Sequence, residues 1–153
     1  MVGKQRPEKY EPELIGQTFE AAQPVYVTAQ MIADFCAVFE ESNPLYTDAE
    51  AAGRGPYGGI VAPPSFAGTF RDGDNIFEQL HRYGTRGLAA GMDVEFLAPI
   101  RAGDTIRITS QLKEVYRKTG RTGPMIFLVI RSTLRNQNNE IVANIDHRFM
   151  NRP

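Results

Sequence analysis

Residues 57–66 read Tyr57-Gly-Gly-Ile-Val-Ala-Pro-Pro-Ser-Phe66 and lie in the least ordinary stretch of the chain. Between positions 51 and 73, nine of 23 residues are glycine or proline, about three times the average usage of these two residues. Such a density is typical of loops, but Tyr57, Ile60 and Val61 are too apolar for a disordered linker. We therefore predict a shaped loop over 51–73 that packs against the rest of the protein.

The residues before this loop predict a strand and a helix. Residues 17–27 are expected to form a short strand, after which Thr28 is a suitable N-cap residue for a helix. The apolar positions of that helix recur at the spacing of one helical face: Ile32, Phe35, Cys36 and Phe39. Asn43-Pro44 is expected to end the helix, because the residue before a proline disfavours helical backbone angles. Cys36 is then expected in the core.

The residues after the loop predict a second helix and then strands. Pro63-Pro64 suits the first turn of a helix. Its apolar positions, with a break near residues 72–74, would be Phe66, Phe70, Ile76, Phe77 and Leu80. From Gly87 onward the apolar residues alternate, which indicates strands separated by turns at 102–104, 119–123 and 136–139. Two helices followed by antiparallel strands predict an α+β fold, with the sheet laid over a buried helix.

Composition limits the chemistry of the chain. It has 153 residues, one cysteine and two histidines, His81 and His147, so a zinc site built from Cys and His and a dithiol redox pair are both excluded. His147 alternates with Ile145 and Phe149 and is expected to pack in the core or at an interface rather than bind a ligand. Few groups remain that titrate near neutral pH, because histidine is the side chain whose ordinary pKa lies there.

Length and charge set further expectations. One domain over 1–153, with a core at about 16–150, fits the size of the chain. Residues 1–13 lack the apolar region of a secretory signal, so we expect a cytoplasmic protein that does not enter a membrane. The net charge of −1 argues against a nucleic-acid partner. Residues 81–153 nevertheless carry a net charge of +6, which indicates either an attraction for anionic ligands or ordinary solvated strand faces.

One motif is rejected. Gly53-Arg-Gly-Pro-Tyr-Gly58 matches the dinucleotide fingerprint letter for letter, but that fingerprint works only between a strand and a helix. The residues before Gly53 do not predict a strand, and Pro63 comes too late to open a phosphate-binding helix. We expect no cofactor.

Three segments in order carry the functional information: Glu41-Ser-Asn-Pro-Leu-Tyr-Thr-Asp48, Tyr57 to Phe66, and Phe96-Leu-Ala-Pro-Ile-Arg-Ala-Gly-Asp104. Together they resemble the MaoC-like acyl-thioester hydratases and dehydratases. The resemblance runs from about Gly16 to Phe149. It implies the hot-dog fold, in which an antiparallel sheet wraps around a central helix, and it implies a dimer acting on an acyl thioester without a cofactor.

The resemblance also implies where catalysis should lie. Catalytic members read Asp-x-Asn-Pro-x-His, and the carboxylate and imidazole activate a water that adds to an enoyl thioester. A glycine N–H at the start of the central helix stabilises the enolate oxygen. In this chain Glu41 stands at the aspartate position, Tyr46 at the histidine position and Pro63 at the glycine position. Glu41 and Tyr46 are therefore the candidate catalytic residues of a degenerate dyad.

These departures resemble one branch of the superfamily, the non-catalytic subunit of heterodimeric fatty-acyl dehydratases. Its members carry an aromatic residue at the histidine position and Ala-Pro at the helix start, as Ala62-Pro63 does here. The catalytic hot-dog subunit of such a pair supplies the dyad, while the degenerate half shapes the acyl pocket. The resemblance implies the following substrate-binding residues: Asn43, Tyr57, Gly59, Ala62, Pro63 and Ser65.

Alternatives remain open at this point. The chain could be a self-sufficient homodimeric (R)-specific enoyl-CoA hydratase that uses Glu41 with Tyr46, or a hot-dog acyl-CoA-binding or thioesterase-type protein. The side chains of Tyr46, Tyr57 and Ser65 could also serve only loop packing. The leading hypothesis is the acyl-thioester-binding subunit of a (3R)-hydroxyacyl-thioester dehydratase or enoyl-CoA hydratase.

Overall fold

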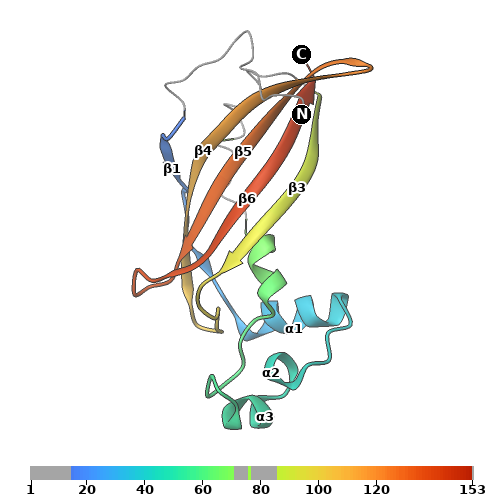
Figure 1. Ribbon diagram of the computed structural model, residues 1–153. Helices are drawn as coiled ribbons and strands as arrows, with labels where there is room; N and C mark the ends of the chain where they lie inside the picture. The colour runs from blue at the N-terminus through green and yellow to red at the C-terminus, as the bar shows by residue number, and fades with distance from the viewer. Residues whose placement is uncertain (1–14, 71–75, 77–85, 153) are drawn as a thin grey trace.

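The computed structural model describes residues 15–70, 76 and 86–152. Four long strands form a curved antiparallel sheet, and the helices gather at one end of it (Figure 1). The elements are β1 (Thr18–Glu20), β2 (Val25–Tyr26), α1 (Ala29–Val38), α2 (Pro44–Thr47), α3 (Ala49–Arg54), the 3₁₀ helix η2 (Pro64–Thr69), β3 (Arg86–Phe96), β4 (Thr105–Gly120), β5 (Gly123–Arg135) and β6 (Ile141–Arg152). In the part of the chain described, no helix is long and apolar enough to span a membrane.

The sheet has the strand order β1-β4-β5-β6-β3, and β2 pairs with the beginning of β4. Every pairing between these strands is antiparallel. Along β4 the buried side chains alternate with more exposed ones, so Ile106 and Ile108 share the inner face. The α+β prediction is confirmed.

The core lies on this inner face and forms two clusters. One contains Ile32 of α1, Phe66 of η2 and Ile145 of β6. The other contains Leu128 of β5 and the helical residue Ile76, which is 1% exposed. Residues from both predicted helical regions are thus packed under the sheet.

The predicted second helix is only partly described. Its first turns form the 3₁₀ helix η2, and Phe70, the residue after it, is extended and buried. Residues 71–75 and 77–85, which include Phe77, Leu80 and His81, lie outside the described residues. A helix begins at Pro64 as expected, but it is 3₁₀ rather than α-helical and ends at Thr69, so Phe70 lies outside it.

Helix α1 begins where the sequence predicts and ends earlier. The hydroxyl of Thr28 accepts the N–H of Met31 at 3.1 Å and caps the helix. The helix ends at Val38, five residues before Asn43, because Glu40 adopts a left-handed backbone with φ of 51°. Phe39 therefore leaves the buried face and is 66% exposed, while Cys36 is buried as predicted.

Two other boundaries differ from the predictions. Residues 17–27 form two strands rather than one, separated by residues 21–24; Pro24 has no N–H to offer a strand. The predicted loop from residue 51 begins inside α3, because the carboxylate of Asp48 caps that helix by accepting the N–H groups of Glu50 and Ala51 at 2.9 and 3.0 Å.

The predicted turns are present. Gly103, at φ of 93°, turns the chain into β4 and donates its N–H to the carbonyl of Val27 at 2.7 Å. Strands β4 and β5 extend to Gly120 and Gly123, so their loop is shorter than the predicted 119–123. His147 is buried, with its ring 6.3 Å from that of Phe149, which confirms its predicted place in the core.

Candidate functional site

The three segments singled out in the sequence meet around one cavity of about 380 Å³. Four segments form its walls. They are Leu45 and Tyr46 from α2, Tyr57 from the loop after α3 (residues 55–60, the glycine-rich loop), residues 61–64 at the start of η2, and residues 96–100 at the end of β3 and just after it. This cavity lies at the end of the sheet where the helices gather (Figure 1). The structure thus brings together stretches that are far apart in the sequence.

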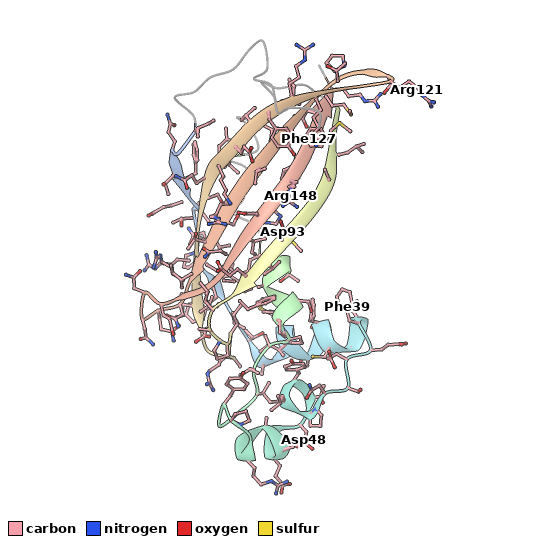
Figure 2. The ribbon with its side chains drawn as sticks, viewed as in Figure 1. Phe39, Asp48, Asp93, Arg121, Phe127 and Arg148 are labelled. Carbon is pink, nitrogen blue, oxygen red and sulfur yellow. The ribbon has the colours of Figure 1, made fainter. Side chains whose placement is uncertain are left out.

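Tyr46 is positioned by a short capped helix. The side-chain oxygen of Asn43 accepts the N–H of Leu45 at 3.0 Å, and Pro44 occupies the first position of α2. The N–H of Tyr46 donates to the carbonyl of Asn43 at 3.0 Å. Asp48 ends α2 and caps α3, at the end of the molecule farthest from Arg121 (Figure 2). These caps hold the Tyr46 side chain at the cavity wall.

The backbone of residues 61–64 has no N–H free to bind a ligand. Val61 donates to the carbonyl of Leu45 at 3.3 Å, and Ala62 donates to the carbonyl of Ile100 at 2.7 Å. Pro63 and Pro64 have no N–H. The turn that precedes η2 therefore contributes apolar surface to the cavity but no hydrogen-bond donor.

Arg101 fixes the glycine-rich loop, and the sequence analysis did not single it out. Its Nη1 donates to the carbonyl of Tyr57 at 2.6 Å, while its backbone N–H donates to the buried carboxylate of Asp104 at 2.8 Å. The sequence feature that could have pointed to Arg101 is its position directly before the Ala102-Gly103-Asp104 turn. Arg101 acts through Tyr57 and is a positioning residue.

The side chains that line the cavity are almost all apolar. Among the residues that line the cavity, the hydroxyls of Tyr46 and Tyr57 are the only polar side-chain atoms. A phenol has an ordinary pKa near ~10 and stays protonated at neutral pH. The wall residues can therefore surround an acyl chain and donate hydrogen bonds, but they contain no group suited to accept a proton near neutral pH.

Glu41, the other candidate catalytic residue, does not line the cavity. Its carboxylate accepts the N–H of Asn43 at 2.9 Å, and its own N–H donates to the carbonyl of Cys36 at 2.8 Å. Burial raises the pKa of the Cys36 thiol, and the negative charge of Glu41 raises it further. The Glu41 side chain stabilises the connection between α1 and α2.

The predicted substrate-binding residues fall into two groups. Tyr57, Ala62 and Pro63 line the cavity. Asn43 and Ser65 are exposed, Gly59 is half-buried, and none of these three lines it. Substrate binding by any of the six stays a prediction.

Comparison with known proteins identifies the family of this chain. Residues 13–145 match the model of the family described as FAS1-like, dehydratase domain region. A UPF0336 protein of Streptomyces coelicolor is 30% identical over 111 residues, which cover 70% of this chain and 74% of that protein.

Solved structures share the fold. A MaoC-like dehydratase superposes with a TM-score of 0.79 at 23% identity over 92% of this chain, which spans only 42% of that longer chain. The C-terminally truncated (3R)-hydroxyacyl-ACP dehydratase complex HadBC of Mycobacterium tuberculosis superposes with a TM-score of 0.71 at 18% identity, covering 90% of this chain and 96% of that one. These likenesses confirm the predicted hot-dog fold. The chain therefore belongs to the family described as FAS1-like, dehydratase domain region.

Proposed function

We propose that this chain is the acyl-thioester-binding, non-catalytic half of a (3R)-hydroxyacyl-thioester dehydratase or enoyl-CoA hydratase. One observation carries the proposal: a cavity formed by the three family segments has an apolar wall with two phenol hydroxyls as its only polar side-chain atoms. Such a cavity suits an acyl chain. Hydration of an enoyl thioester also needs a base for the water and a donor for the enolate oxygen, and both would come from a partner.

The lack of a hydrogen-bond donor in the cavity wall supports the proposal most strongly. In this reaction the thioester carbonyl becomes an enolate, and loss of one oxyanion donor typically lowers turnover by about 10²–10³-fold. The amides of Val61 and Ala62 are already bonded to backbone carbonyls. Pro63 stands at the position that supplies the N–H in catalytic members, and it has none.

Neither Glu41 nor Tyr46 is suited to act as the base in this cavity. Water must lose a proton as it attacks the β-carbon, and the α-carbon must gain one. Tyr46 reaches the cavity but is a poor base at neutral pH. Glu41 carries a carboxylate, but this carboxylate accepts the N–H of Asn43 and does not line the cavity. This separation favours a binding role over a self-sufficient dyad.

The open edge of the sheet supports a dimer. Strand β3 pairs with β6 on one side only, and within the described residues no strand covers its other side. Met92, Phe96 and Leu97 expose about half of their surfaces along this edge, at 48%, 46% and 52%. An uncovered strand edge with apolar side chains is a surface that proteins normally pair or protect. We propose a second hot-dog subunit as the occupant.

The test is co-expression with a hot-dog chain that carries Asp-x-Asn-Pro-x-His. We expect a stable complex that hydrates crotonyl-CoA, while the isolated chain does not. In the complex, Tyr46→Phe should change kcat by less than about threefold, because it removes no essential proton transfer. Tyr26→Phe, an exposed tyrosine outside the cavity, is the matched control.

Three outcomes would overturn the proposal. Hydration by the isolated chain that is abolished by Glu41→Gln would establish a homodimeric hydratase. Hydrolysis of acyl-CoA by the isolated chain would establish a thioesterase-type protein. The absence of both a complex and a gain in hydration would remove the subunit role.

A further inference from the structure

A second, polar groove lies where the turn between β5 and β6 approaches the connection between β1 and β2. Its volume is about 610 Å³, and it is lined by residues 20–24, by 107–109 of β4 and by Arg135 with the turn that follows it. Figure 1 shows this turn at the lower left, at the opposite end of the sheet from the loop between β4 and β5. The groove shares no residue with the 380 Å³ cavity formed by the three family segments, called the acyl cavity below.

Two arginines face each other in this groove. Arg107 and Arg135 are direct register partners on β4 and β5. Both point away from the buried face, because Ile106 and Ile108 on either side of Arg107 are buried. Directly opposed side chains have Cβ atoms about 5 Å apart, and like charges at such positions destabilise a sheet.

Three other basic residues of the sheet are neutralised by carboxylates. Arg131 and Lys113 share the carboxylate of Asp146, and Arg148 pairs with Asp93 (Figure 2). The Arg135 side chain, in contrast, donates only to the carbonyl of Asn139, at 3.1 Å, and within the described residues the Arg107 side chain has no hydrogen bond or ion pair.

The rest of the groove is polar and locally fixed. The side chain of Gln137 accepts the N–H of Thr105 and donates to Asp104, both at 3.0 Å. Glu20 brings one carboxylate to the wall, without an ion pair to either arginine within 4 Å. The two arginines and Glu20 leave a net charge of +1.

We propose that this groove binds a phosphate-type oxyanion, either free phosphate or the phosphate group of a larger molecule. Two guanidinium groups on adjacent strands present N–H forks that match the oxygens of a phosphate. A bound dianion also neutralises the opposed charges that the fold otherwise holds together. The proposal depends on Arg107 and Arg135 and is independent of the acyl cavity.

The test is titration calorimetry at constant ionic strength in phosphate-free buffer, with inorganic phosphate and with adenosine 3′,5′-bisphosphate as separate ligands. Arg107→Ala and Arg135→Ala should each weaken binding at least about tenfold, since a hydrogen bond to a charged group is lost. Arg107→Lys keeps the charge without the fork and should bind with intermediate affinity. Glu20→Gln should bind more tightly, because it removes the negative charge from the wall.

The matched control is Arg121→Ala, which removes one positive charge at the far end of the sheet (Figure 2). It should leave binding unchanged. Tighter binding of the bisphosphate would identify a phosphorylated organic ligand, and equal binding would identify free phosphate. The proposal fails if the wild-type chain binds neither anion, or if Arg121→Ala weakens binding as much as Arg107→Ala. Without ligand, Arg107→Ala should melt no lower than the wild type, which shows that it folds.

Discussion

The amide N–H of Ala62 donates a 2.7 Å hydrogen bond to the carbonyl oxygen of Ile100. This bond ties the turn before η2 to the segment that follows β3, and the neighbouring Val61 and Arg101 form a further bridge between the same two segments. The bond that builds the cavity wall thus uses the last amide before the two prolines. The residue that follows, Pro63, has no N–H, so neither position offers a free hydrogen-bond donor to the cavity.

Restoring an N–H at position 63 should not restore catalysis. Pro63→Gly supplies an amide at the family's oxyanion position but leaves the cavity without a base. We expect no crotonyl-CoA hydration by the isolated variant. Its free energy of unfolding should fall by about 1 kcal/mol, because glycine is far freer than proline in the unfolded chain. Pro64→Gly, measured in the same urea titration, is the control for this loss. Hydration by Pro63→Gly alone would show that a base is present after all.

Enlarging Ala98 should limit the acyl chains that the cavity accepts. Ala98 is half-buried in the cavity wall, and a phenylalanine there would fill part of the 380 Å³. In the assembled dehydratase, Ala98→Phe should raise KM for long acyl thioesters at least about tenfold and leave crotonyl-CoA nearly unchanged. Ala37→Phe, on the exposed surface of α1, is the control. An equal effect on both substrates would contradict an acyl role for this wall.

Removing the Arg101 guanidinium should loosen the glycine-rich loop. Arg101→Leu removes the 2.6 Å bond to the carbonyl of Tyr57. The amides of residues 55–59 should then exchange with solvent faster, and stability should fall by about 1–2 kcal/mol, the cost of losing a charged hydrogen bond. Arg54→Leu, which breaks only an exposed pair with Glu50, is the matched control. Unchanged exchange in 55–59 would remove the positioning role.

Asp146 should make the sheet sensitive to acid. Burial opposes its ionisation, but hydrogen bonds and charge from Arg131 and Lys113 outweigh burial and hold the pKa of Asp146 below its usual 3.8. Because the folded pKa is the lower one, this stabilisation is present above pH 3.8 and is lost as the pH falls through the folded pKa.

Asp146→Asn should therefore destabilise the chain by about 1–2 kcal/mol at neutral pH and by much less in strong acid. This loss of stability is modest because the Arg131 and Lys113 side chains are 37% and 45% exposed. Urea unfolding at several pH values measures it, with the exposed Asp34→Asn as control. If the difference in free energy of unfolding between the wild type and Asp146→Asn did not change with pH, the ion pairs of Asp146 would not be its cause.

Cys36 should react slowly with thiol reagents, and Glu41 should contribute to that slowness. Cys36 is 3% exposed, and burial followed by the Glu41 charge raises the pKa of its thiol. Glu41→Gln should increase the rate of labelling by about two- to threefold in mild alkali, because more thiolate forms. Glu40→Gln removes a neighbouring charge as the control. If both variants increased the labelling rate of Cys36 equally, the increase would come from a general loosening of the structure around α1 and not from the charge of Glu41.

Much of the fold could be predicted from the sequence because local rules decided it. Thr28 capped α1, the Ala102-Gly103-Asp104 turn formed, and alternation placed His147 in the core. The end of α1 could not be predicted, because Pro44 was a visible helix stop whereas the left-handed Glu40 that ends the helix is not a residue type that signals one. Helix α3 was missed because Gly53 within it and Gly55 directly after it outweighed the capping by Asp48.

The site was predictable as three converging segments but not in detail. Tyr46 and Pro63 line the cavity as expected, whereas Glu41 turns to an amide two residues away, which no spacing rule reveals. Arg101 was missed because its partner is a backbone carbonyl 44 positions earlier in the chain. The arginine before the turn was visible in the sequence, but its partner depends on tertiary packing and cannot be identified from a local motif.

The paired prolines at 63 and 64 also determine how much order a ligand must impose. Each ring fixes one backbone torsion, so this part of the wall has little conformational freedom to lose when an acyl chain settles against it. A flexible glycine turn would have to be frozen at every binding event. The same two prolines that provide no hydrogen-bond donor thus give the cavity a pre-formed wall.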